Sequence, residues 1–546
     1  MLALLLQCIT LYVVSWTLWR ILRRLIIKTD LDNLPGPPPA SFLKGNFGKV
    51  FNPDAWAFHK ELAEHYGRVV RIDGFLGDKQ VYLFDPKAVY HVVVKDQDVY
   101  EESASFLEAN RLFFGEGLLA TLGEQHRKQR KMLAPAFSIA HLRNMTPIFF
   151  DVAHKLRAGI AAKVASGPRE IDMLRWMSRT ALELIGRSGL GRSFDTLADD
   201  SDTHPYSVSV KQLIPTAFHF FFIRVYLLPT LVKIGTPKLR RFVVDMVAES
   251  FWTRLRKLRD IIDVVHDTSV EIFEEKKRAL EAGDAAVTSD VEEGKDIISI
   301  MMKANMQASP EDRLPDKEVL GQMSTLTFAA MDTTSVALSR TLHMLATHPK
   351  VQEKLRQEIL SARREGSDLS YDEVSTLPFL DAVCRETLRM YPPFPNILRT
   401  TRETVSMPLT TPIKGNDGRE MHEVVIPKNT NIIISVLNCN RDPALWGPDS
   451  HEWKPERWLK PLPQVLTDAH IPGIYSHLMT FLGGGRACIG FKFSQLEMKV
   501  VLSVLLSNFR FSLSEKEILW QMTGIQTPTV KGQPMFPQLL LQVSLV

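Results

Sequence analysis

A cysteine near the C-terminal end of the chain stands in a setting that favours chemistry. Three glycines at positions 483–485 and Arg486 precede Cys488, and a helical pattern begins at Ile489. Glycines permit tight turns and close approach of the backbone to a flat or bulky group. At the start of a helix, the helix dipole and the free N–H groups stabilise a cysteine as the thiolate, which is the form that binds metals. We therefore interpret Cys488 as a metal ligand.

The alternative for this loop is a phosphate site. The segment lacks the spacing G-x-x-x-x-G-K-[ST], and no G-x-G-x-x-G pattern fits it. A thiolate is a good ligand for heme iron and supplies electron density that favours cleavage of the O–O bond. Arg486 is a natural partner for an anionic heme propionate. The loop is therefore typical of a heme site with Cys488 on the iron.

Two further groups of polar residues have spacings that could place them together on a helix. Asp332 and Thr333 lie in the middle of a long apolar helical pattern, where buried polar groups need partners. They indicate either a bend in the helix or acid–base chemistry at a buried site. Glu386 and Arg389, at positions i and i+3, share one helix face and can form an ion pair. Most such pairs are solvated surface charges, so this second group alone is a weak signal.

Several elements must position these residues. The sequence predicts a helix from Asp316 to His348, bounded by Pro315 and Pro349 and roughly 50 Å long. It also predicts a final helix over 489–508 and strands over 69–72 and 81–84. The apolar segment 213–231 fits either a core helix or a lid that dips into a membrane, and we expect the core helix.

Composition narrows the class of protein. The 546 residues are 45% hydrophobic and 23% charged, which is a globular composition. The net charge of +4 is too mild to indicate a nucleic-acid partner. The four cysteines have no paired spacing, so we expect no disulfide framework and a reducing compartment.

The N-terminus has the pattern of a membrane anchor. Leu2 to Trp19 carries no charge, and Arg20, Arg23, Arg24 and Lys28 follow it. A cleaved signal peptide would carry its positive charge before the apolar run and a small-residue cleavage site after it. We predict a transmembrane anchor over 1–28, with the rest of the chain in the cytoplasm. A stiff Pro-rich linker over 29–45 and a catalytic domain over 46–546 follow.

The cysteine loop resembles a specific family pattern. The heme-binding motif of cytochromes P450, F-x-x-G-x-R-x-C-x-G, is matched at every fixed position. The resemblance implies that Cys488 is the axial ligand of the heme iron and that Phe481 packs near the sulfur. The matching residues are Phe481, Gly484, Arg486, Cys488 and Gly490.

Other segments resemble the same family in the same order. Ala329 to Thr334 is similar to the oxygen-activation motif, with Ala330 in place of the usual glycine. This implies that Thr333 hydrogen-bonds the oxygen being activated and that Asp332 helps to relay protons. The resemblance also implies a structural core in which Arg457 joins Glu386 and Arg389. By the same resemblance the propionate ligands are Arg130, His126 in place of a tryptophan, and Arg399, with Arg402 as competitor.

The resemblance implies a mainly α protein with a small β-rich subdomain, the cytochrome P450 fold, preceded by one N-terminal transmembrane helix. It implies heme b and a monooxygenase that inserts one atom of O₂ into a hydrophobic small molecule, in secondary-metabolite biosynthesis (for example of terpenoids) or xenobiotic oxidation. Electrons would come from a separate NADPH-dependent FAD/FMN reductase, with cytochrome b5 as a possible second donor, at the endoplasmic reticulum membrane. The alternatives are a heme-thiolate isomerase or dehydratase that needs no O₂, and a non-catalytic heme-binding protein.

Overall fold

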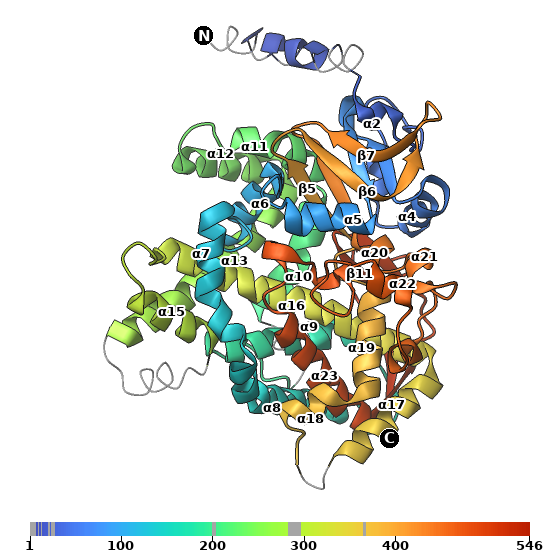
Figure 1. Ribbon diagram of the computed structural model, residues 1–546. Coiled ribbons are helices and arrows are strands. Elements are labelled where there is room, and N and C mark those ends of the chain that lie inside the picture. The colour runs from blue at the N-terminus through green and yellow to red at the C-terminus, as the bar shows by residue number, and fades with distance from the viewer. Residues whose placement is uncertain are drawn as a thin grey trace. The chain divides into compact units, whose positions relative to one another are not determined.

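The computed structural model describes residues 28–546 except 199–203, 282–295 and 364–366, together with residues 7, 8, 10–12, 14–19 and 22. The chain forms two compact units (Figure 1). The first comprises Met1–Ser103, Pro395–Ser450 and Pro463–Arg486. The second comprises Ala104–Phe394, His451–Leu462 and Ala487–Val546. The predicted anchor over 1–28 lies largely outside the described residues.

The first unit is built on a five-stranded sheet with the order β1-β2-β8-β5-β3. β2 and β8 are parallel and the other pairs are antiparallel. The predicted strands over 69–72 and 81–84 correspond to β1 and β2. The strands are β1 (Val69–Asp73), β2 (Lys79–Leu83), β3 (Tyr100–Glu101), β5 (Asn396–Thr401) and β8 (Asn431–Ser435), beside a hairpin of β6 (Val405–Lys414) and β7 (Glu420–Ile426).

Short helices surround these strands, and α5, α20 and α21 among them begin with a capping side chain. In α5, for example, Asp85 accepts from the Ala88 N–H and Pro86 occupies the first turn. The helices are α2 (Asp30–Asn33), α3 (Phe47–Val50), α4 (Trp56–Glu61), η1 (Leu62–Tyr66), η2 (Phe75–Gly77), α5 (Pro86–Tyr90), η3 (His91–Lys95), α20 (Val436–Cys439), α21 (Pro443–Trp446), α22 (Gln464–Asp468), η8 (Met479–Phe481) and η9 (Gly484–Arg486).

The second unit is mostly helical, with two small sheets. One sheet has the order β4-β12-β9, and the other is the hairpin of β10 and β11. The strands are β4 (Arg169–Asp172), β9 (Phe509–Leu513), β10 (Ile518–Thr523), β11 (Ile525–Val530) and β12 (Leu540–Leu545). The helices are α6 (Ala104–Phe114), α7 (Gly123–Leu133), η4 (Ala134–Phe137), α8 (Ile139–Val164), α9 (Met173–Ile185), η5 (Gly186–Leu190), α10 (Pro205–Phe218), η6 (Ile223–Leu227), α11 (Leu228–Leu231), α12 (Pro237–Ser250), α13 (Thr253–Glu281), α15 (Ile297–Gln307), α16 (Asp316–Thr347), α17 (Pro349–Ala362), α18 (Tyr371–Thr376), α19 (Pro378–Met390), η7 (Pro455–Leu459) and α23 (Phe491–Asn508).

The long helix α16 forms as predicted, from Asp316 to Thr347. Pro315 caps its start, and His348 leaves helical geometry just before Pro349. It is continuous through Asp332 and Thr333, so these residues mark no break in the helix. The predicted final helix also forms, with Gly490 as the N-cap of α23 and Phe491 as the first helical residue.

The apolar segment 213–231 is not one core helix, so this expectation was wrong. α10 ends at Phe218, and a π-helical turn, η6, leads into α11. Leu213 is buried, whereas Leu227 and Leu231 are each 46% exposed, so the second half of the segment lies at the surface of its unit. Among the described residues no single helix is long and apolar enough to span a membrane, but α10 and 223–231 pass that test as a pair bent by 77°.

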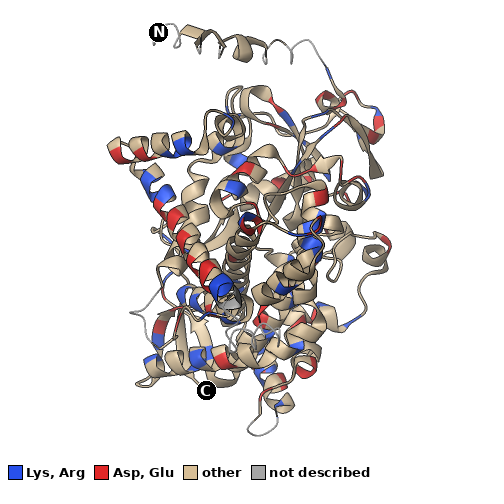
Figure 2. Ribbon diagram, turned by 90° about the vertical axis from the view of Figure 1, so that its left-hand side faces the viewer, with Lys and Arg blue, Asp and Glu red and all other residues tan. Residues whose placement is uncertain are grey.

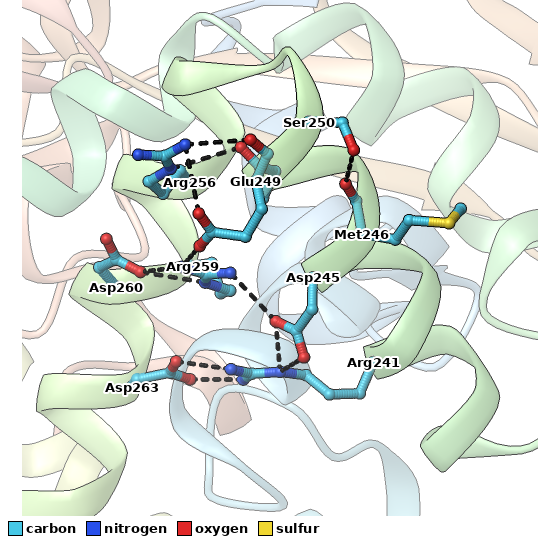
Figure 3. A network of polar contacts seen from close by, with 10 residues as sticks. Arg241, Asp245, Met246, Glu249, Ser250, Arg256, Arg259, Asp260 and Asp263 are labelled. Carbon is cyan, nitrogen blue, oxygen red and sulfur yellow. Dashed lines mark hydrogen bonds and ion pairs between the residues drawn. The ribbon is translucent and has the colours of Figure 1, made fainter.

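The next helix, α12, is held to α13 by a network of charges (Figure 3). Arg241 pairs with both Asp245 and Asp263, and Arg259 pairs with Asp245 and Glu249. The two carboxylates around Arg241 raise the pKa of its guanidinium, and this contact lowers the pKa of Asp245. The network fixes which face of α12 meets α13.

Another face of α12 carries apolar side chains in the open. Leu239, Phe242, Val243 and Met246 follow the spacing i, i+3, i+4, i+7, and all four are exposed. We call these four residues the α12 stripe. Exposed apolar groups gathered in a patch mark interaction sites more often than scattered ones do.

Candidate active site

Cys488 lies three residues before the start of α23 in the second unit. Its side chain is accessible, yet it lies deep among protein atoms, so burial raises the pKa of the thiol. The Gly490 N–H and the Arg130 guanidinium act in the opposite direction and lower this pKa. Arg130, on α7, donates to the Ala487 carbonyl over 2.7 Å. The structure therefore brings two predicted site residues, Cys488 and Arg130, into one neighbourhood.

The glycines before Cys488 permit close backbone approach within the first unit. Gly484 has φ +65°, and a Cβ there would lie 1.9 Å from the Val93 carbonyl oxygen. A Cβ on Gly483 would lie 1.7 Å from the Pro472 carbonyl oxygen. Neither clash can be relieved without moving backbone, so both positions require glycine. By contrast, a Cβ on Gly490 would meet only an ordinary contact at 3.7 Å.

Two predicted propionate ligands meet at one carboxylate in the first unit. Arg399 and Arg486 each lie 3.2 Å from a Glu102 carboxylate oxygen. Arg399 is buried, and burial lowers the pKa of its guanidinium while Glu102 raises it. Arg402, the competitor, pairs instead with Glu101 at 2.8 Å. Phe481 is buried and packs edge-on against Tyr475, with ring centroids 5.7 Å apart.

The middle of α16 carries a small accessible window. Every side chain from Gly321 to Leu342 is buried except those of Ala329, Ala330 and Thr333. Positions i, i+1 and i+4 share one side of a helix, so the three side chains face the same space. The Thr333 hydroxyl donates to the Ala329 carbonyl over 2.8 Å. A reacting molecule placed at this window would meet two methyl groups and one hydroxyl.

The window helix and the cysteine helix are joined directly. The hydroxyls of Thr334 on α16 and Ser494 on α23 lie 3.3 Å apart. Ser494 is six residues beyond Cys488 in the sequence. The helix that follows the thiol and the helix that carries the window therefore belong to one unit and pack against each other.

Asp332 has a partner that the sequence patterns did not indicate. Lys211 on α10 lies 2.5 Å from a carboxylate oxygen of Asp332, and it donates to the Ser335 hydroxyl over 2.7 Å. Lys211 is the single charged residue between Pro205 and Ile223, which was the signal available in the sequence. Such an ammonium in an apolar stretch requires a polar partner when it is buried.

Glu386, Arg389 and Arg457 also come together. Glu386 and Arg389 are fully buried and share two hydrogen bonds of 2.8 and 2.9 Å. Arg457 lies 3.5 Å from the same carboxylate, which also accepts from the indole N–H of Trp458 over 3.0 Å. Buried ion pairs need this many hydrogen bonds to offset desolvation. The cluster links α19 to η7.

His126 is buried on α7, one helical turn before Arg130. Two basic neighbours have local partners. Arg127 pairs with Glu124 at 2.9 Å, and Lys128 donates to the Glu311 carbonyl over 2.6 Å. The third basic residue, Lys131, is exposed.

Comparison with known proteins gives the family. The family model for cytochrome P450 matches residues 35–536. A cytochrome P450 monooxygenase of Postia placenta is 54% identical over 528 residues, covering 96% of each chain, and another is 49% identical over 525 residues. A ganoderic acid synthetase of Ganoderma lucidum is 44% identical over 533 residues, covering 97% of this chain and 96% of the relative. The chain belongs to the cytochrome P450 family. Within that family it is a monooxygenase.

The cofactor of this family is heme b, and the described residues fit it. The accessible thiol of Cys488 has the right chemistry for an axial ligand. Arg399 and Arg486 share a single carboxylate, and a guanidinium, with its charge and five N–H donors, has the right chemistry to bind an anionic propionate. The window on α16 presents only the small side chains of Ala329, Ala330 and Thr333.

Proposed function

We propose that the protein oxidises a hydrophobic small molecule with O₂, using a heme b held by Cys488. The observation that carries this proposal is the pairing of an accessible thiol just before α23 with a window on α16 that exposes Thr333 beside the buried acid Asp332. Heme supplies the oxygen-activating chemistry when bound, while the chain supplies the ligand, the protons and the shape.

Each residue then has a task that follows from its surroundings. The Gly490 N–H and Arg130 would stabilise the Cys488 thiolate and so keep the ligand in its binding form. Arg399, Arg486, Arg130 and His126 would hold the propionates. Thr333 would donate a hydrogen bond at the window, and Asp332 would supply protons toward it. Glu386, Arg389 and Arg457 would hold the segment before the cysteine loop.

The substrate is proposed to be an apolar secondary metabolite, for example a terpenoid. Phe114 stacks on Phe328 with ring centroids 4.5 Å apart, directly before the window on α16. Phe113 is buried next to this pair. Aromatic and aliphatic walls with few polar groups favour apolar ligands. The name of the relative from Ganoderma lucidum, a ganoderic acid synthetase, supports a role in secondary metabolism.

Electrons are proposed to come from an NADPH-dependent FAD/FMN reductase, with cytochrome b5 as a second donor, because the sequence has no pattern of a flavin- or NADPH-binding segment. The basic residues Arg127, Lys128 and Lys131 are candidates for docking an acidic partner. The local contacts of Arg127 and Lys128 mean that such a partner would compete with Glu124 and the Glu311 carbonyl.

Membrane attachment is proposed through the predicted anchor over 1–28 and the α12 stripe. The residues between 7 and 22 that the structure describes carry no charged side chain (Figure 2). Trp16 and Trp19 suit an interface between lipid and water. The endoplasmic reticulum, with the catalytic domain in the cytoplasm, is the proposed location.

The test uses the full chain in membranes with a reductase, NADPH and ¹⁸O₂. We expect a strongly red-shifted Soret band for the reduced carbon-monoxide complex, and one ¹⁸O atom in a product that requires NADPH. Cys488→Ala should lose heme or leave an inactive pigment. Product without NADPH would indicate an isomerase or dehydratase. NADPH consumption without an oxidised product over a broad substrate panel would indicate a non-catalytic heme protein.

A further inference from the structure

The ammonium group of Lys211 joins two elements of the second unit. It sits on α10 and contacts Asp332 and Ser335, which lie three residues apart on α16. The Ser335 hydroxyl in turn donates to the Asp332 backbone carbonyl over 3.0 Å. Asp332 is therefore fixed from two sides, through its side chain and through its own peptide group.

The contact lies almost out of solvent. The side chain of Lys211 is 16% exposed and that of Asp332 is 7% exposed. Charges in such a place interact strongly because little water screens them. The ammonium holds one carboxylate oxygen, Oδ1, and thereby fixes the orientation of the carboxyl group of Asp332, which precedes Thr333 on α16.

We propose that Lys211 is a positioning residue that holds Asp332 so that it delivers protons toward Thr333. This inference rests on the proposed function, in which Asp332 is the acid. Hydroxylation consumes O₂, two electrons from the NADPH of the reductase and two protons, and it gives the alcohol and one water. When protons arrive at the wrong place, the same electrons and protons reduce O₂ to H₂O₂ instead. Positioning of the acid therefore determines the yield of product per NADPH.

The chain offers a matched control for this contact. Lys276 on α13 lies 2.9 Å from an Asp296 carboxylate oxygen and 3.0 Å from the Ser299 hydroxyl. Ser299 follows Asp296 by three residues, as Ser335 follows Asp332. The two sites are equally buried, with side chains 15% and 4% exposed at the second one. They differ in that Asp296 caps α15, whereas Asp332 lies beside the window.

The experiment compares Lys211→Met, Lys211→Arg and Lys276→Met in the heme-loaded full chain with reductase. For Lys211→Met we expect an unchanged Soret band of the reduced carbon-monoxide complex. Product per NADPH should fall about tenfold, since a positioned acid contributes 10²–10⁴-fold and Lys211 supports it indirectly. Peroxide and the solvent deuterium isotope effect on product formation should rise. Lys211→Arg should recover much of the yield, and Lys276→Met should keep it.

A double substitution separates positioning from folding. In Lys211→Met/Asp332→Asn both charges are removed, so no lone buried carboxylate remains if Lys211→Met alone folds poorly. If Lys211 acts through Asp332, the double variant should have the yield of Asp332→Asn. An unchanged yield in Lys211→Met, or a further loss in the Asp332→Asn background, would overturn the inference. Failure of the proposed function can be told apart from failure of this inference, because the unsubstituted protein itself would then form no NADPH-dependent product.

Discussion

At the residue scale, the Thr333 hydroxyl is the one polar group that α16 exposes at its buried middle. We expect Thr333→Ala to retain the heme spectrum and divert reducing equivalents to peroxide, with a yield of product per NADPH at least tenfold lower. Thr341→Ala is the control, because Thr341 makes the same bond to a helix carbonyl at 2.8 Å but is buried. Equal yields in the two variants would place oxygen activation elsewhere.

A second residue, Glu497 on α23, is buried with no hydrogen-bond partner for its carboxylate among the described residues. Burial raises the pKa of this carboxyl well above its usual value. The folded state keeps the proton that the unfolded chain loses above about pH 4.5. The free energy of unfolding therefore falls by about 1.4 kcal/mol for each pH unit as pH rises from that value toward the raised pKa.

Glu497→Gln should remove this dependence, because the amide has nearly the same shape and no charge. We expect the melting temperature of the variant to exceed that of the unsubstituted protein, by a difference that grows as pH rises from 5 to 8. Thermal unfolding followed by circular dichroism measures this. Glu515→Gln, at an exposed position, serves as control. A loss of stability that is the same at every pH would mean that Glu497 is ionised and partnered.

At the element scale, α16 is held at one end by a contact between two glycines. A Cβ on Gly321 would lie 2.5 Å from the Gly117 nitrogen and 2.8 Å from the Glu116 carbonyl carbon. Alanine forms helices better than glycine by about 1 kcal/mol, but backbone atoms cannot yield as side chains do. We expect Gly321→Ala to lower the free energy of unfolding by about 1–3 kcal/mol, as overpacking does.

Chemical denaturation of the two proteins checks this expectation. Gly48→Ala is the matched control, since a Cβ there would meet nothing within 4 Å. A stabilised Gly321→Ala variant would show that α16 can move away from residues 115–117 without loss.

The long elements could be predicted because their signals are local. Prolines bound α16, and a glycine-rich pattern precedes α23, so both helices were found within a few residues. The segment 213–231 was misread because a core helix and an exposed lid share the same apolar composition. The partnership of Lys211 with Asp332 joins residues 121 apart, and only the packing of α10 on α16 creates it. The sequence could indicate a charge that needs a partner, but not which partner.

At the scale of the whole molecule, the α12 stripe is proposed to contact lipid in addition to the predicted anchor. A photo-crosslinking phenylalanine analogue at position 242 should form lipid adducts in microsomes, because Phe242 is 65% exposed. The same analogue at exposed position 266 on α13 is the control. Equal adduct yields at both positions, detected by mass spectrometry, would argue against contact of the stripe with lipid.

The π-helical turn η6 has a consequence for how such enzymes diverge. Its i→i+5 hydrogen bonding takes up one residue more than an α-helical turn. Deleting one residue from 223–227 would let this turn continue as α-helix, and the residues after it would keep their direction because the wide turn had absorbed the extra residue. The exposed leucines of α11 and the Lys211 contact of α10 would both stay in place. Single-codon deletions here would therefore be tolerated within a lineage while its chemistry stayed intact.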